Sequence, residues 1–193
     1  PSQSRWARHR VRRMTISPAY LEQQKQLHQN PNYGVASLQY AELVIAVADQ
    51  VKAKSIADYG AGKCNLRKKM TELGRPEFDY FPYDPVFPDY GAPHPADLVA
   101  CIDVLEHIEM EHLDAVLADL KGIMQRVGVF TIHTGPAIKH LPDGRNAHLI
   151  QQPPSWWLPR LCRFFEIVHL QRTPGGFWLL VEPLAGAASP ENA

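Results

Sequence analysis

The sequence predicts an α/β fold, with a single doubly wound sheet that is mostly parallel. Short apolar runs of strand length alternate along the chain with longer segments of helical periodicity. The first of these runs, KSIADYG, ends in a glycine turn, as strands that pass into helices commonly do. The last two runs are separated only by TPGG, which predicts an antiparallel hairpin at one edge of the sheet.

The expected helices share an apolar spacing of three and four residues. The first begins with Ser17 and Pro18, which favour the N-cap and the first turn, and NPNYG ends it. Gly74 and Pro76 stop the third helix. Helices are predicted at 17–30, 37–51, 65–73, 111–126 and 154–164.

The expected strands are short and mainly apolar. A proline-rich loop, 85–95, follows the second strand. Strands are predicted at 54–60, 77–84, 97–103, 127–134, 165–172 and 177–183.

Composition is that of an ordinary soluble domain. The chain has 193 residues, 45% of them apolar and 21% charged, and its formal net charge is zero. This balance gives no general reason to expect nucleic acid or an anionic membrane as a partner, and no apolar run approaches the roughly 18 residues of a membrane helix. The three widely spaced cysteines form no CxxC pair, which favours reduced thiols and a cytoplasmic protein.

Three regions are expected along the chain. Residues 1–16 form a basic arm, which either contacts phosphates or is a flexible tail. Residues 17–184 form the folded domain, and the small and polar residues 185–193 are expected to fray. The arginines of the arm are Arg5, Arg8, Arg10, Arg12 and Arg13.

The glycine turn in ADYGAGKCNL allows three interpretations. A phosphate-binding loop, GxxxxGK[ST], fails at Ala57 and Cys64. A dinucleotide fingerprint, GxGxxG, fails at Asn65, which disfavours a nicotinamide-dependent oxidoreductase. The third interpretation is a nucleoside that carries an amino acid, with Gly60 and Gly62 allowing the backbone to approach it closely.

Two aspartates fit the third interpretation. Asp58 precedes the glycines, where a carboxylate would repel a pyrophosphate but suits a cationic ligand. Asp84 ends the second strand, where a carboxylate can accept both hydroxyls of a ribose.

The segments DYGAGKCNL, YDP and DLVACIDVLEHIE resemble the first, second and fourth motifs of class I S-adenosylmethionine-dependent methyltransferases, in a match from about Ser37 to Glu182. The resemblance implies their Rossmann-like sheet and S-adenosylmethionine as the cofactor. It departs from the family at Cys64, where a third glycine is usual, and in the short 85–95 loop, where a helix and a strand look trimmed. The implied cofactor residues are Asp58, Gly60, Gly62, Asp84, Pro85, Ile102 and Asp103.

The fourth motif restricts the methyl acceptor. DVLE lacks the [DNS]PP[YFW] turn of enzymes that methylate exocyclic base nitrogens, and no Pro-Cys pair suggests cytosine-C5 chemistry. A hydroxyl, or an amine on a small molecule, remains as the acceptor. An oxygen nucleophile needs a base or a Lewis acid near neutral pH.

Asp103, Glu106 and His107 would project from one face of a helix that began at Asp103. Two carboxylates and an imidazole are a partial shell for Mg²⁺ or Mn²⁺. The motif is similar to those of ubiquinone-pathway O-methyltransferases and of enzymes that 2′-O-methylate small-RNA 3′ ends, and this similarity implies His148 as a further ligand. Alternatively, His107 acts alone as a base or orienting group, or the cluster only caps a helix.

The sequence thus predicts O-methylation of a hydroxyl on a small molecule, a saccharide or an RNA end, with Glu106, His107 and His148 as catalytic residues. The alternatives are an N-methyltransferase for a small amine and a non-catalytic protein that binds S-adenosylmethionine. No membrane partner is expected.

Overall fold

The computed structural model describes residues 14–185. Most of the predicted basic arm and nearly all of the predicted tail therefore lie outside the described residues. No helix among the described residues is long and apolar enough to cross a membrane.

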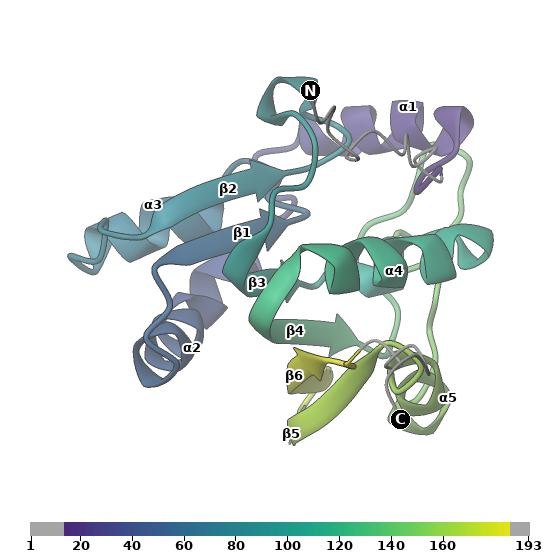
Figure 1. Cartoon of the computed structure of the whole chain (residues 1–193). Helices are drawn as coiled ribbons and strands as arrows, with labels where there is room; N and C mark the ends of the chain where they lie inside the picture. Colours follow the sequence, from purple (N-terminus) through teal and green to yellow (C-terminus); the bar gives the residue numbers. More distant parts are fainter. Residues whose placement is uncertain (1–13, 186–193) are drawn as a thin grey trace, which may run out of the picture.

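A six-stranded sheet with the order β2-β1-β3-β4-β6-β5 forms the centre of the molecule (Figure 1). The first four strands pair in parallel, whereas β6 runs antiparallel to both β4 and β5. This confirms the predicted doubly wound sheet with an antiparallel hairpin at its edge. The strands are β1 (Ser55–Tyr59), β2 (Asp79–Tyr83), β3 (Ala96–Ile102), β4 (Met124–His133), β5 (Phe165–Thr173) and β6 (Gly176–Pro183).

Helices cover both faces of the sheet. On one face, α2 and α3 pack with Leu98, Ala100 and Ile102 of β3. On the other face, α4 and α5 pack with Val99 and Cys101 of the same strand. Because β3 is buried on both sides, it reads in the sequence as an unbroken apolar run. The helices are α1 (Pro18–His28), α2 (Ser37–Gln50), α3 (Asn65–Glu72), α4 (Leu113–Ile123) and α5 (Pro154–Leu161).

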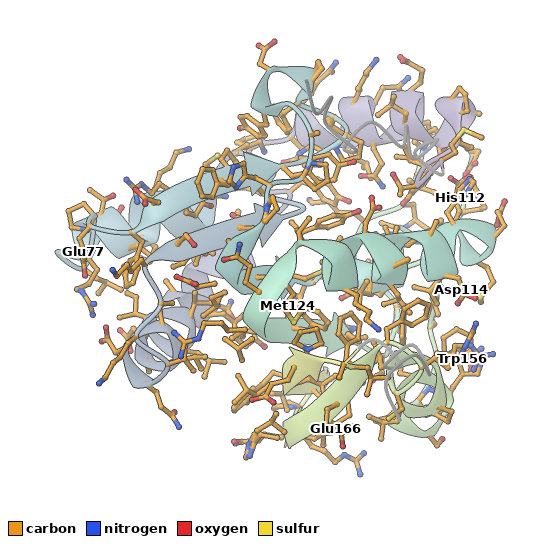
Figure 2. All side chains as sticks on the ribbon, in the orientation of Figure 1. Glu77, His112, Asp114, Met124, Trp156 and Glu166 are labelled. Carbon is orange, nitrogen blue, oxygen red and sulfur yellow. The ribbon has the colours of Figure 1, made fainter. Side chains whose placement is uncertain are left out.

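The segment after β3 differs from the prediction. No helix begins at Asp103, whose own backbone is left-handed (φ 50°) and therefore not part of a right-handed helix. Two single 3₁₀ turns follow, Leu105–His107 and Met110–His112, before α4 begins at Leu113. The helix predicted over 111–126 ends earlier, because Met124, labelled in Figure 2, already starts β4 and pairs with β3.

The connection from β2 to β3 is short, as predicted. It contains one 3₁₀ turn, Pro88–Tyr90, and no described strand lies beyond β2. The helix and strand expected there in a longer chain are therefore missing from this part of the fold.

Helix α1 lies beyond the carboxyl ends of β1 and β2 (Figure 1). Ser17 is its N-cap, as predicted, and the Ser17 hydroxyl oxygen accepts a hydrogen bond from the backbone N–H of Tyr20 at 3.2 Å. The backbone N–H and hydroxyl of Ser17 also donate to the Glu109 carboxylate, at 2.7 and 2.6 Å. These bonds hold α1 against the segment that follows β3.

Candidate active site

The turn after β1 requires glycine at its first position. Gly60 has a φ of 83°, and a Cβ there would lie 2.4 Å from a methyl carbon of Val104. Its backbone N–H and that of Ala61 donate to the Tyr83 carbonyl at 2.8 and 3.0 Å. The end of β1 is therefore fixed to the end of β2.

Cys64 adopts a backbone conformation that favours glycine. Its φ is 54°, in the left-handed region. Its thiol lies 3.4 Å from the Tyr90 hydroxyl, which in turn donates to the Gly62 carbonyl at 2.9 Å. The thiol thus supports the turn through Tyr90, and burial raises its pKa.

Two buried carboxyl groups flank this turn. Asp58 is only 3% exposed and accepts a hydrogen bond from the Tyr80 hydroxyl. Burial raises the pKa of Asp58 to about 7. Asp84 accepts from the backbone N–H groups of Gly62 and Val86, at 3.0 and 2.9 Å, and burial raises its pKa as well.

A cavity of about 410 Å³ opens at this edge of the sheet. Ligand pockets of roughly 300–1,000 Å³ are typical for small molecules and cofactors. His107 and His148 also line the cavity, whereas Glu106 is not among its lining residues. All the residues predicted to bind the cofactor line it: Asp58, Gly60, Gly62, Asp84, Pro85, Ile102 and Asp103.

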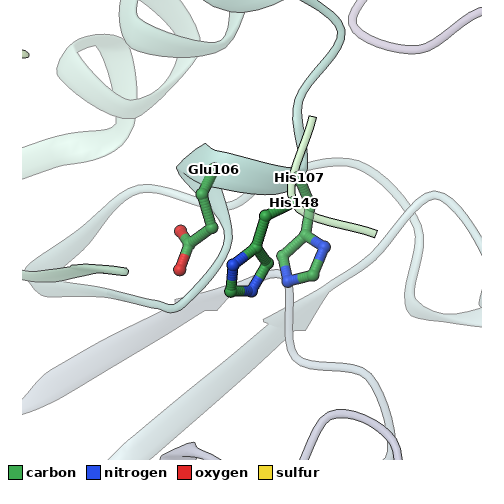
Figure 3. A group of neighbouring side chains, drawn as sticks. All are labelled: Glu106, His107 and His148. Carbon is green, nitrogen blue, oxygen red and sulfur yellow. The ribbon is translucent and has the colours of Figure 1, made fainter. Parts of the chain in front are cut away.

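Glu106, His107 and His148 form one cluster, shown in Figure 3, in which one donor atom from each lies within 4.8 Å of the others. The Nδ1 atoms of His107 and His148 lie 2.8 and 2.7 Å from the carbonyls of Ala147 and Gly135. Because a carbonyl only accepts, each Nδ1 carries the proton, and each neutral ring keeps a free lone pair on Nε2. This arrangement is common for histidines that bind metals.

The Glu106 carboxylate is fully buried, and its two oxygens differ in their hydrogen bonding. Its Oε1 accepts from the backbone N–H of His133 at 2.8 Å, while its Oε2 has no hydrogen-bond partner among the described residues. A buried carboxylate oxygen without a partner is costly, and a cation beside it removes that cost. Burial raises the pKa of Glu106 well above its usual value, with the nearby Asp103 adding to the effect.

The two imidazoles of the cluster are neutral near pH 7. Burial lowers the pKa of His107 to about 3, and the adjacent His148 adds to the shift. Burial also lowers the pKa of His148. Neutral imidazoles and a carboxylate are suitable ligands for a divalent cation, so the donor set fits the predicted metal.

The conformation of the loop between β4 and α5 places His148 in the cluster. The Asn146 side chain accepts from the backbone N–H groups of Ala137 and His148, each at 2.9 Å, and donates to the Ala137 carbonyl at 2.8 Å. The backbone N–H of Ile150 donates to the Glu106 carbonyl at 2.9 Å. These bonds tie the loop to the 3₁₀ turn that carries Glu106 and His107.

Asp103 lies outside the cluster of donor atoms found among the described residues. Its carboxylate accepts a hydrogen bond from the Thr131 hydroxyl, and its backbone N–H donates to the same side chain at 2.8 Å. The helical face that was to align Asp103 with Glu106 and His107 does not exist, because the chain turns at Asp103. Of the four predicted metal ligands, the structure brings together Glu106, His107 and His148.

Sequence reasoning missed the contribution of α1 and the turn after it. Tyr20 donates to the His107 carbonyl at 2.6 Å and accepts from Gln24 at 2.6 Å, and Tyr33 donates to Gln24 at 3.0 Å. His28 lies over the glycine turn, with its Cε1 3.3 Å from the Cβ position of Gly62. The spacing of Tyr20, Gln24 and His28, four residues apart each time, was the available signal.

Several solved structures of methyltransferases resemble this one. A Burkholderia thailandensis 1,6-didemethyltoxoflavin-N1-methyltransferase with bound S-adenosylhomocysteine has a TM-score of 0.59 and 16% identity, over 90% of this chain and 93% of that chain. A DhpI–S-adenosylhomocysteine complex has a TM-score of 0.53 and 13% identity, over 87% and 98%. The methyltransferase domain of bacterial CtHen1-CN has a TM-score of 0.50 and 14% identity, over 77% and 100%.

The chain has the class I methyltransferase fold. No family model and no curated protein matches the sequence. In open parallel sheets of this kind, ligands bind beyond the carboxyl ends of the strands. In this chain the cavity lies at the carboxyl ends of β1, β2 and β3.

Proposed function

We propose that the protein is an S-adenosylmethionine-dependent methyltransferase that acts on a hydroxyl group. One observation carries this proposal: a single cavity contains the glycine turn, Asp58 and Asp84, and also His107 and His148. The first group of residues suits the cofactor, and the second suits an oxygen nucleophile. The neighbours by fold bind S-adenosylhomocysteine, which supports the choice of cofactor.

The cofactor residues have separate roles in this proposal. Asp58 faces the ammonium group of the methionine part, where Gly60 and Gly62 permit close approach of the backbone. Asp84 binds the ribose hydroxyls, and Ile102 and Asp103 lie beneath the sulfonium. S-adenosylmethionine supplies an activated methyl group when it is bound. The residues of the protein hold and align the two reactants.

Glu106, His107 and His148 would hold a divalent cation such as Mg²⁺ or Mn²⁺. A bound cation of this kind lowers the pKa of a hydroxyl group. The unpartnered Glu106 Oε2 and the two free Nε2 atoms support this assignment. Without a cation, the neutral His107 can orient the hydroxyl by accepting its hydrogen bond at Nε2.

A second candidate is methyl transfer to a nitrogen of a small molecule. It is favoured by the neighbour with a TM-score of 0.59, which is an N1-methyltransferase. The cavity and the proposed cofactor residues are common to both candidates. Only the acceptor atom differs.

Calorimetry with S-adenosylhomocysteine tests the cofactor assignment. We expect one molecule to bind per chain, and Asp84→Asn to weaken binding by about tenfold or more, since a hydrogen bond to a charged group contributes roughly 1.5–3 kcal/mol. Asp89→Asn, on the exposed 3₁₀ turn nearby, is the matched control and should bind as the unmodified chain does. No binding at millimolar ligand, with folding confirmed by circular dichroism, would remove the proposed function.

A further inference from the structure

The cavity extends away from the glycine turn, along the segments that carry His107 and His148. Ile108 follows His107 directly, and Ile138 lies on the loop that brings His148 into place. Ile16 precedes the N-cap of α1 and Tyr20 lies in its first turn, and this end of the helix is bonded to Glu109 and to the His107 carbonyl. We call these lining residues, together with one from α4, the acceptor end of the cavity: Ile16, Tyr20, Ile108, Val116 and Ile138.

The acceptor end is apolar, including its rim. The Ile138 side chain is 98% exposed although it borders the cavity. A side chain this exposed takes no part in the core. It is therefore available to a bound molecule.

The polar groups near this end mostly satisfy one another. The Tyr20 hydroxyl is bonded to the His107 carbonyl and to Gln24, and Gln24 is bonded to Tyr33. The Nε2 atoms of His107 and His148 remain as acceptors, because each Nδ1 faces a carbonyl. A ligand that fits this end therefore needs a polar group at the histidines and an apolar body elsewhere.

Few basic side chains of the described residues line the cavity. Among its described lining residues, Lys139 is the only lysine or arginine, against four acids: Asp58, Asp84, Asp103 and Glu109. Arg145, on the same loop as Lys139, donates to Asp143 at 2.9 Å. Binding of a nucleic acid depends mainly on several basic residues that contact its phosphates.

We propose that the methyl acceptor is an uncharged, largely apolar small molecule, whose hydroxyl group faces His107 and His148 and whose body contacts the acceptor end. This inference rests on the proposed methyltransferase function. It predicts that phosphorylated compounds and RNA ends bind more weakly than such a molecule.

The test compares three probes on the full chain saturated with S-adenosylhomocysteine: 2-naphthol, 2-naphthyl phosphate and a short RNA with a free 3′ hydroxyl. The first two probes share their rings, and the second carries a phosphate ester in place of the free hydroxyl. We expect 2-naphthol to bind at least about tenfold more tightly than its phosphate, since an anion gains little where basic groups are scarce. The RNA should bind more weakly than 2-naphthol at physiological ionic strength.

Variants of Ile138 locate the probe without disturbing the core. Ile138→Ser should weaken binding of 2-naphthol by about threefold or more, through loss of apolar contact, while Ile138→Leu should change it by less than about twofold. Lys139→Gln should leave binding of 2-naphthol unchanged. An equal loss of affinity for 2-naphthol in Ile138→Ser and Ile138→Leu would overturn the placement of the probe against Ile138.

The results separate this inference from the proposed function. Failure of S-adenosylhomocysteine to bind removes the methyltransferase assignment. If S-adenosylhomocysteine binds but 2-naphthol does not, or if the phosphate or the RNA binds as tightly as 2-naphthol, only the inference about the acceptor is overturned.

Discussion

Gly60 shows how a single residue fixes the cavity wall. Its left-handed backbone and its contact with Val104 leave no room for a side chain. Gly74 provides a comparison, because its φ of 75° is similar but nothing lies within 4 Å of its Cβ position. Differences between alanine variants at these positions therefore report the contact with Val104 rather than the backbone angle.

We expect Gly74→Ala to lower the free energy of unfolding by about 1 kcal/mol, for the left-handed backbone alone. Gly60→Ala should cost roughly 1–3 kcal/mol more, because the added methyl group overpacks the turn. Urea unfolding of both variants measures the difference. Equal losses of unfolding free energy in the two variants would show that the turn at Gly60 shifts to make room for the added methyl group.

Glu106 and Glu111 offer a matched pair for the metal. Glu106 is fully buried in the cluster, whereas Glu111 is exposed on the next 3₁₀ turn. Glu106→Gln should abolish high-affinity binding of Mn²⁺, measured by calorimetry, because the charged ligand is lost. Glu111→Gln should bind Mn²⁺ normally. Failure of the unmodified chain to bind Mn²⁺, or full methyltransferase activity in a chelator, would contradict the metal assignment.

The sequence could predict Glu106 and His107 as candidates because they stand side by side after a buried strand. It could propose His148 only through resemblance, since the meeting of His148 with His107 depends on the loop that Asn146 organises. Asp103 was misplaced for a similar reason. Its left-handed backbone is supported by Thr131, a residue from a different strand.

Among the elements, the strands were predictable and the segment after β3 was not. Strands buried on both faces leave a strong apolar signal, as in β3. The stretch from Asp103 to His112 is shaped by tertiary bonds instead, including those from Ser17 to Glu109. The closure of α1 over the site likewise depends on contacts between distant parts of the sequence.

Ser17 is the residue through which the attachment of α1 can be tested. Ser17→Ala removes the N-cap bond to Tyr20 and the hydroxyl bond to Glu109, and should cost about 1–2 kcal/mol. Amide hydrogen exchange in α1 should accelerate. Ser155→Ala, at an exposed position in the first turn of α5, should change stability by less than about 0.5 kcal/mol. Unchanged exchange in α1 would show that other contacts hold the helix.

For the whole molecule, the buried Asp58 links stability to pH. Its pKa is about 7 in the folded chain and close to 4 when unfolded, so the native state binds the extra proton between these values. The Asp58 contribution is therefore fully present below about pH 4 and is lost as pH rises through about 7.

Asp58→Asn should flatten this fall in the free energy of unfolding between about pH 4 and 7, by on the order of a few kcal/mol. Asparagine can still accept the hydrogen bond from Tyr80. Chemical unfolding at a series of pH values is the measurement, with Asp89→Asn as the exposed control. An unchanged slope in the Asp58 variant would assign the pH dependence to other groups.

No strand of residues 14–185 lies beyond β2, and this has a consequence for how copies of this chain meet. An uncovered strand is a template on which a second chain can add and aggregate. The Tyr83 carbonyl faces β1, so the preceding residue, Pro82, directs its backbone nitrogen the opposite way. Proline has no N–H to donate, so at Pro82 the edge of β2 cannot form the backbone hydrogen bond that an added strand would need. The edge of β2 is therefore a poor template for the addition of a strand from another copy of this chain.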